Sequence, residues 1–128
     1  MPIMTKSNVS SQVAEKPNST KPDVNKVFRT LSDSESFYFY KAFGKPIGER
    51  ATSLTDFLKK LEKVDALSIA FHYYRGDFER WIRETIGDPV LASRLSVRGR
   101  TVLKGEALRE LVVQTIRVRF NEFKVNIP

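Results

Sequence analysis

The chain contains no cysteine and only one histidine among its 128 residues. Without cysteine, the protein has no disulfide bond, no thiolate metal ligand and no thiol nucleophile. It also lacks an apolar run near the ~18 residues that a membrane span needs, and it shows no charged and then apolar leader of the signal-peptide type. We therefore expect an intracellular, cytoplasmic protein that makes no membrane contact.

Catalysis and metal binding have few candidate residues. His72 and Asp77 could act as a base and its orienting carboxylate, because an imidazole needs a hydrogen-bonded partner to fix its tautomer. No second histidine or serine nucleophile elbow accompanies them, and no carboxylate spacing is typical of zinc or calcium ligands. We expect no enzyme, no cofactor and no metal. The favoured interpretation is that Asp77 caps a helix beginning at Phe78, while His72 or Arg75 braces the corner.

Positive charge gathers at the C-terminal end of the chain. From Arg94 onward there are eight Lys or Arg residues and three Glu residues, a charge of +5 within the chain's net +7. Clustered cations attract the phosphates of DNA or RNA, and exposed tyrosines could stack on unpaired bases. The alternative is that these cations form an ordinary solvated surface. The candidate nucleic-acid contacts are Arg94, Arg98, Arg100, Lys104, Arg117 and Arg119.

The N-terminal third divides into a polar tail and an aromatic strand. Most of residues 1–30 belong to a stretch rich in Ser, Asn, Lys and Pro, which predicts a disordered tail. One compact domain is expected to follow at residues 31–128. Residues 37–40 alternate phenylalanine with tyrosine and Phe43 follows, a pattern that favours a strand. The glycines and the proline of residues 44–48 indicate a turn that leads to a short returning strand.

Helix start and stop signals dominate residues 53–97. Ser53 with Asp56 is a variant of the capping box, and Asp65 can cap a second helix. Gly76-Asp77 and Gly87-Asp88-Pro89 each combine a helix-ending glycine with an acidic N-cap. The residues expected to build these corners are His72, Arg75, Gly76, Asp77, Trp81, Gly87, Asp88 and Pro89.

The last segment carries mixed signals. Residues 98–105 are expected to form an exposed loop or a short hairpin. The residues that follow begin with helical spacing, but residues 115–120 alternate like a strand. The helix propensity of residues 106–111 favours a helix through about residue 120. The sequence does not decide between helix and strand for residues 112–120.

These signals predict an α+β fold that is mostly helical. A short N-terminal aromatic β-hairpin should be followed by a cluster of four short helices and a longer C-terminal helix. We expect the core to contain Phe37, Phe39, Leu54, Phe57, Leu61, Phe71, Phe78, Trp81, Ile82, Ile86, Leu91, Leu95, Leu108 and Leu111.

Three stretches of the chain together resemble a known family. They read FYFYKAFGKPIGERATSLTDF, VDALSIAFHYYRGDFERWIRETIGDPVLA and GEALRELVVQTIRVRF. The chain is similar to a small, mainly archaeal domain family of unknown function, marked by Phe-His-x-x-Arg-Gly-Asp-Phe-x-x-Trp and a Gly-Asp-x-x-Leu-Ala corner. More distantly, DFERWIRETIGDPVLA is similar to the tryptophan segment of archaellum accessory proteins. The resemblance covers roughly residues 36–123 and implies one domain, an archaeal setting and assembly in place of catalysis, without supplying an activity.

Two functions fit these observations. The leading hypothesis is a non-enzymatic adaptor module that binds a protein partner or pairs with a second copy of itself. The alternative is a basic accessory protein that binds nucleic acid, DNA or RNA, largely through the phosphate backbone.

Overall fold

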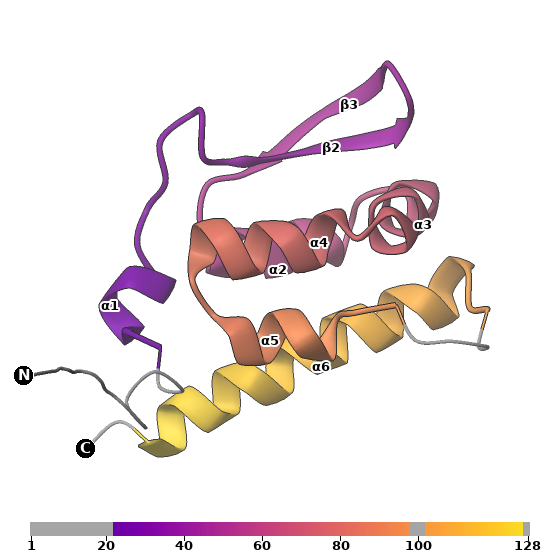
Figure 1. Cartoon of the computed structure of the whole chain (residues 1–128). Coiled ribbons are helices and arrows are strands. Elements are labelled where there is room, and N and C mark those ends of the chain that lie inside the picture. The colour runs from indigo at the N-terminus through magenta and orange to yellow at the C-terminus, as the bar shows by residue number, and fades with distance from the viewer. Residues whose placement is uncertain (1–21, 98–101, 127–128) are drawn as a thin grey trace, which may run out of the picture.

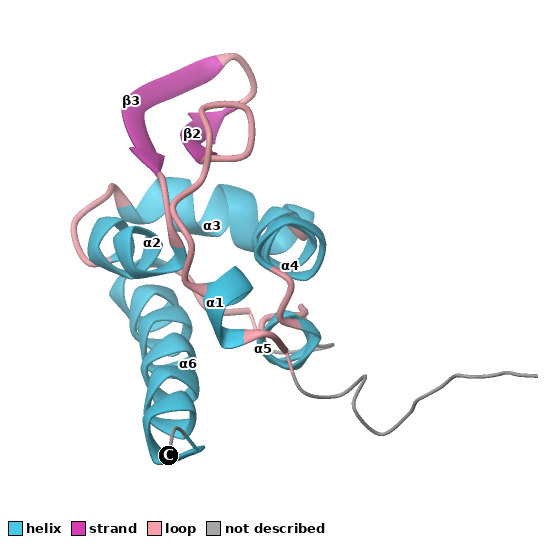
Figure 2. Cartoon of the chain, turned by 90° about the vertical axis from the view of Figure 1, so that its left-hand side faces the viewer, coloured by secondary structure: helices cyan, strands magenta, loops and turns pink. Residues whose placement is uncertain are grey.

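The computed structural model describes residues 22–97 and 102–126 of the chain, with side chains described through residue 124. Figures 1 and 2 show three layers, with a β-hairpin above a middle layer of short helices, and below them the long C-terminal helix with one short helix beside it. The elements are α1 (Val24–Val27), β2 (Phe37–Ala42), β3 (Lys45–Ala51), α2 (Leu54–Leu61), α3 (Ala66–Arg75), α4 (Asp77–Trp81), the π-helical turn η2 (Ile82–Ile86), α5 (Pro89–Arg94) and α6 (Gly105–Asn126). The expected α+β, mostly helical fold is confirmed. Because η2 continues α4, four short helices lie between the hairpin and α6, and α1 precedes the hairpin.

The hairpin places one aromatic face on the helices. Strands β2 and β3 are antiparallel, and Ala42 lies opposite Lys45, so Phe43 and Gly44 form a two-residue turn. Gly44 has a φ of +71°, a conformation that glycine adopts without steric cost. Phe37 and Phe39 are buried beneath the hairpin, whereas the residue between them, Tyr38, is exposed. The expected alternation of a half-buried strand is therefore present.

Most of the expected helix boundaries are present. The side chains of Ser53, Asp65 and Asp88 each accept a backbone N–H at the start of α2, α3 and α5. Gly76 and Gly87 have φ values of +77° and +92°, the left-handed conformation that ends helices. These backbone features make the tight corners of the middle layer.

Asp77 is not the N-cap of α4. Gly76 holds that position, no side chain caps the helix, and Asp77 is its first residue. Its carboxylate bonds instead to the side chains of His72, Arg75 and Arg80. Charged and ring N–H donors compete well for a carboxylate, because hydrogen bonds between ionised groups are stronger than those to a neutral amide.

The long helix α6 runs through the segment whose state the sequence left open. It is helical from Gly105 to Asn126 and buries Leu108, Val112 and Ile116 in the core. This face is rotated relative to expectation, and Leu111, which we expected to be buried, is 41% exposed. Phe71 is likewise only half-buried, because its ring packs against the exposed Phe43 at the edge of the hairpin.

The described domain begins earlier in the chain than the sequence suggested. Part of the expected tail, residues 22–30, includes α1, and Val27 of that helix is fully buried. The ring of Phe28 packs edge-on against Phe120 and Phe123 of α6, each at 5.3 Å between ring centroids. Residues 1–21, and residues 98–101 of the basic segment at 98–105, lie outside the described residues. Among the helices in the described ranges, none is both long and apolar enough to cross a bilayer.

Candidate functional site

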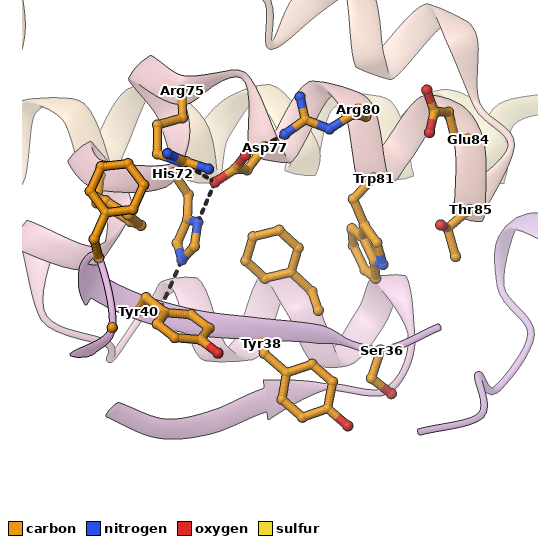
Figure 3. Close-up of a pocket in the computed structure, with 14 residues that line it drawn as sticks. Ser36, Tyr38, Tyr40, His72, Arg75, Asp77, Arg80, Trp81, Glu84 and Thr85 are labelled. Carbon is orange, nitrogen blue, oxygen red and sulfur yellow. Dashed lines mark hydrogen bonds and ion pairs between the residues drawn. The ribbon is translucent and has the colours of Figure 1, made fainter. Parts of the chain in front are cut away.

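A groove of about 490 Å³ lies between strand β2 on one side and helices α3 and α4 and the turn η2 on the other. Figure 3 shows His72, Asp77 and Trp81 on its helical side and Tyr38 and Tyr40 on its strand side. Five of the eight corner residues predicted from sequence lie at or beside this groove, namely His72, Arg75, Gly76, Asp77 and Trp81. The other three, Gly87, Asp88 and Pro89, form the next corner, between η2 and α5.

Both ring nitrogens of His72 are occupied by internal hydrogen bonds. Its Nε2 accepts the backbone N–H of Tyr40 at 2.8 Å, which requires an unprotonated Nε2. Its Nδ1 therefore carries the hydrogen and donates to Oδ2 of Asp77, also at 2.8 Å. The dashed lines in Figure 3 trace this relay from strand to ring to carboxylate. The imidazole consequently ties β2 to the corner between α3 and α4, and neither nitrogen is left over for a substrate.

Burial keeps His72 neutral and its neighbours keep Asp77 ionised, which holds this arrangement in place near neutral pH. Burial lowers the pKa of His72, and it outweighs the opposing effect of the Asp77 carboxylate. Burial works to raise the pKa of Asp77, yet hydrogen bonds from His72 and Arg75 hold it below its usual range. A neutral imidazole thus faces an ionised carboxylate, which also pairs with Arg75 at 3.0 Å and with Arg80.

Aromatic rings form the two ends of the groove. At one end the guanidinium of Arg75 lies over Phe43 and Phe71, at 4.7 and 5.0 Å from the ring centroids. The Phe43 ring itself is 76% exposed at the hairpin turn. At the other end Trp81 is buried, and its Nε1 donates to the backbone oxygen of Glu35 at 2.8 Å. The groove therefore offers apolar surface with cations along its rim.

The basic residues proposed for nucleic acid do not meet on this groove. Arg119 is buried and donates from Nε to Oδ2 of the fully buried Asp88 at 2.9 Å. Arg94 and Arg119 both bond to Glu122, at 2.9 to 3.0 Å.

Of the other candidates, Arg117 pairs with Glu62, and Lys104 is exposed next to the start of α6. Arg98 and Arg100 lie outside the described residues. Three of the four candidates that the structure describes therefore have their charge matched by a carboxylate. Arg119 serves the core and is not presented to solvent.

Sequence reasoning missed several groove residues. Phe43, Arg80 and Thr85 come from the turn, from α4 and from η2, and only the packing of the hairpin on the helices brings them together. The available signal was Phe43, a large apolar residue in a turn that is otherwise rich in glycine and lysine.

Comparison with known proteins gives a family without a known activity. Within residues 22–97 and 102–126, no three His, Asp or Glu side chains converge as a metal site would require. The chain has no match among curated proteins or among solved structures. Residues 34–127 match the family of unknown function DUF5752, which covers most of the chain, and the protein therefore belongs to that family.

Proposed function

We propose that this protein is a non-enzymatic binding module that holds an extended segment of a partner protein in the groove between β2 and α4. One observation carries the proposal. The N–H of Tyr40 points to His72 and not to β3, so the second edge of β2 faces the groove. A strand edge with a helix opposite it is the arrangement in which peptide-binding domains add an extended peptide to their sheet.

We propose that β2 has backbone groups available for such pairing. Residues two apart in a regular strand turn their N–H groups to the same side, and although the register shifts between Tyr38 and Tyr40, we place the N–H of Tyr38 on the same outer edge as that of Tyr40. His72 occupies the Tyr40 N–H, and the backbone of Ser32 already accepts the N–H of Ser36. An incoming segment would therefore pair around Tyr38, in the middle of the groove.

The chemistry of the walls favours a segment with a large apolar side chain. Phe43, Phe71 and Trp81 present rings around the groove, and aromatic rings contribute much of the binding energy at protein interfaces. The rim cations Arg75 and Arg80 have 42% and 54% of their side chains exposed, and both are partly neutralised by Asp77. Apolar contact and backbone pairing would then contribute more than charge.

The occupied nitrogens of His72 support a binding role over catalysis. A general base needs a free lone pair within reach of the proton that it removes. The Nε2 lone pair of His72 is used by Tyr40 and its Nδ1–H by Asp77. We assign His72 the task of holding β2 in place, so that the rest of the edge that faces away from β3 stays open.

The resemblance to archaellum accessory proteins suggests a setting for this module. The similar segment, residues 77–92, contains α4 and η2, which form the helical wall of the groove. We propose an archaeal, cytoplasmic protein that docks on a component of a larger assembly.

A library of random peptides displayed on phage tests the proposal directly. The full chain is the bait, and enriched peptides are synthesised and titrated against the wild type, Phe43→Ser and Leu67→Ser. Phe43 and Leu67 are both apolar and exposed, but only Phe43 lines the groove. We expect Phe43→Ser to weaken binding about tenfold, as for an interface anchor, and Leu67→Ser to leave it unchanged. If no peptide is enriched, or if Phe43→Ser and Leu67→Ser bind alike, the proposal is wrong.

A further inference from the structure

The long helix α6 has a second apolar stripe that the described part of the chain covers only in part. One side of α6 is packed in the core through Leu108, Val112 and Ile116. Leu111 and Val118 lie seven residues apart on a different side and are 41% and 51% exposed. A surface helix normally has one apolar stripe, which faces its own core, so a second stripe indicates a second contact.

The surface beside this stripe is hollow. A depression of about 320 Å³ adjoins Leu111, with Tyr74 and Leu103 in its lining. The hydroxyl of Tyr74 donates to the backbone oxygen of Leu103 and accepts the backbone N–H of the same residue, so this wall is held in place. The exposed Leu111 is thus part of a shaped surface that another helix could cover.

Two charged residues identify the direction of the contact. Glu110 and Lys124 are exposed on one flank of the stripe, about four helical turns apart. Neither forms an ion pair with any described residue. Arg117 lies between them on the same flank, and its charge is met by Glu62. The flank is therefore negative at one end, neutralised in its middle and positive at the other end.

We propose that α6 pairs with α6 of a second copy of this chain in antiparallel orientation. The two-fold axis passes near Arg117, which brings Glu110 of each copy to Lys124 of the other and makes the two charge pairs identical. The Val118 residues of the two copies meet near the axis, and Leu111 of each copy lies farther out along the seam, near Asn121 of the other copy. The C-terminal part of each helix then covers the hollow beside Leu111 of the other copy. This contact lies on the helical layer farthest from the hairpin, so it is independent of the peptide groove (Figure 1).

A charge exchange between two separate variants tests the antiparallel register. Glu110→Lys places lysine at both ends of the flank, and Lys124→Glu places glutamate at both ends. Each variant alone repels itself, and we expect its dimer dissociation constant to rise about tenfold or more. Mixed together, the two variants form opposite-charge pairs at both ends and should recover a heterodimer. The measurement is sedimentation velocity of the full chain over a wide range of concentration at low salt.

Two further variants separate this contact from other modes of association. Val118→Glu should abolish the dimer, whereas Leu67→Glu, at an apolar residue exposed elsewhere on the domain, should leave it intact. Circular dichroism checks that each variant remains folded. The proposal is overturned if the wild type stays monomeric at every concentration, or if mixing the two charge variants yields no heterodimer.

Discussion

At the scale of single residues, the two hydrogen bonds of His72 define the protonation state of its ring. Its Nε2 must be unprotonated to accept from Tyr40, and its Nδ1–H must be present to reach Asp77. Only one tautomer of the neutral ring satisfies both partners. Protonation would place an N–H against the N–H of Tyr40 and break the link between α3 and β2.

This requirement predicts that stability falls in mild acid. The pKa of His72 is lower in the folded protein than its ordinary value of 6.5, so the unfolded chain takes up more protons as the pH falls below about 6.5. The stability contributed by the neutral ring is present above that pH and is lost below it. Chemical denaturation of the wild type between pH 7.5 and 5 measures the slope. His72→Leu should be less stable at neutral pH and should lack that part of the slope; an unchanged slope would contradict the assignment.

Asp77 makes a second prediction at this scale. Asp77→Ala leaves the buried Nδ1–H of His72 without an acceptor, and we expect a loss of about 1–3 kcal/mol. Asp77→Asn retains one carbonyl oxygen for His72 and should cost less. Thermal or urea unfolding of both variants gives the comparison. Equal losses in the two variants would mean that the hydrogen bond to His72 contributes little.

At the scale of elements, one buried ion pair joins the start of α5 to α6. Asp88 caps α5 through Leu91 while both of its oxygens accept from Arg119. Arg119 also lies over the ring of Phe123, at 4.4 Å from the ring centroid. Since Asp88 is fully buried, its charge depends on Arg119 for compensation.

Removing the cation should therefore be costly. We expect Arg119→Met to lower the free energy of unfolding by about 3–5 kcal/mol, because it leaves a carboxylate buried without its partner. Arg117→Met on the same helix removes a more exposed pair with Glu62 and should cost less than about 1 kcal/mol. Urea unfolding compares the two variants. A similar small loss in both would show that Asp88 is stabilised by other means.

Local signals predicted the elements better than they predicted the site. Gly76, Gly87 and Pro89 mark real corners, because their backbone constraints act within a few residues. Asp77 was misassigned because a sequence cannot show that His72 and two arginines compete for its carboxylate. The side of α6 that we expected to be buried differs from the observed one for a similar reason. Helical spacing alone does not say which of two apolar stripes meets the core. The groove could not be predicted at all, because it exists only between segments that folding brings together.

At the scale of the whole molecule, three of the candidate nucleic-acid contacts within the described residues already have their charge paired, and we therefore expect weak binding to nucleic acid. Arg94, Arg117 and Arg119 each have a carboxylate partner within the domain. We expect duplex DNA, single-stranded DNA and RNA to bind no more tightly than ~10⁻⁴ M at physiological salt, the weak end of non-specific affinity. Fluorescence anisotropy at two salt concentrations measures this. Sub-micromolar binding that weakens steeply with salt and in a variant with Arg94, Arg98 and Arg100 changed to Ser would instead favour the nucleic-acid alternative.

The central claim is that β2 is an open sheet edge that accepts an extended segment. Hydrogen exchange of the Tyr38 amide tests it most directly, measured by NMR on the ¹⁵N-labelled full chain with and without a peptide selected by display. The account predicts that exchange at Tyr38 slows at least about tenfold in the complex, because its N–H becomes part of a new ladder, while amides of α6 are unaffected. The claim would be contradicted if the exchange rate of the Tyr38 amide is unchanged in the complex and the chemical-shift changes lie away from the groove.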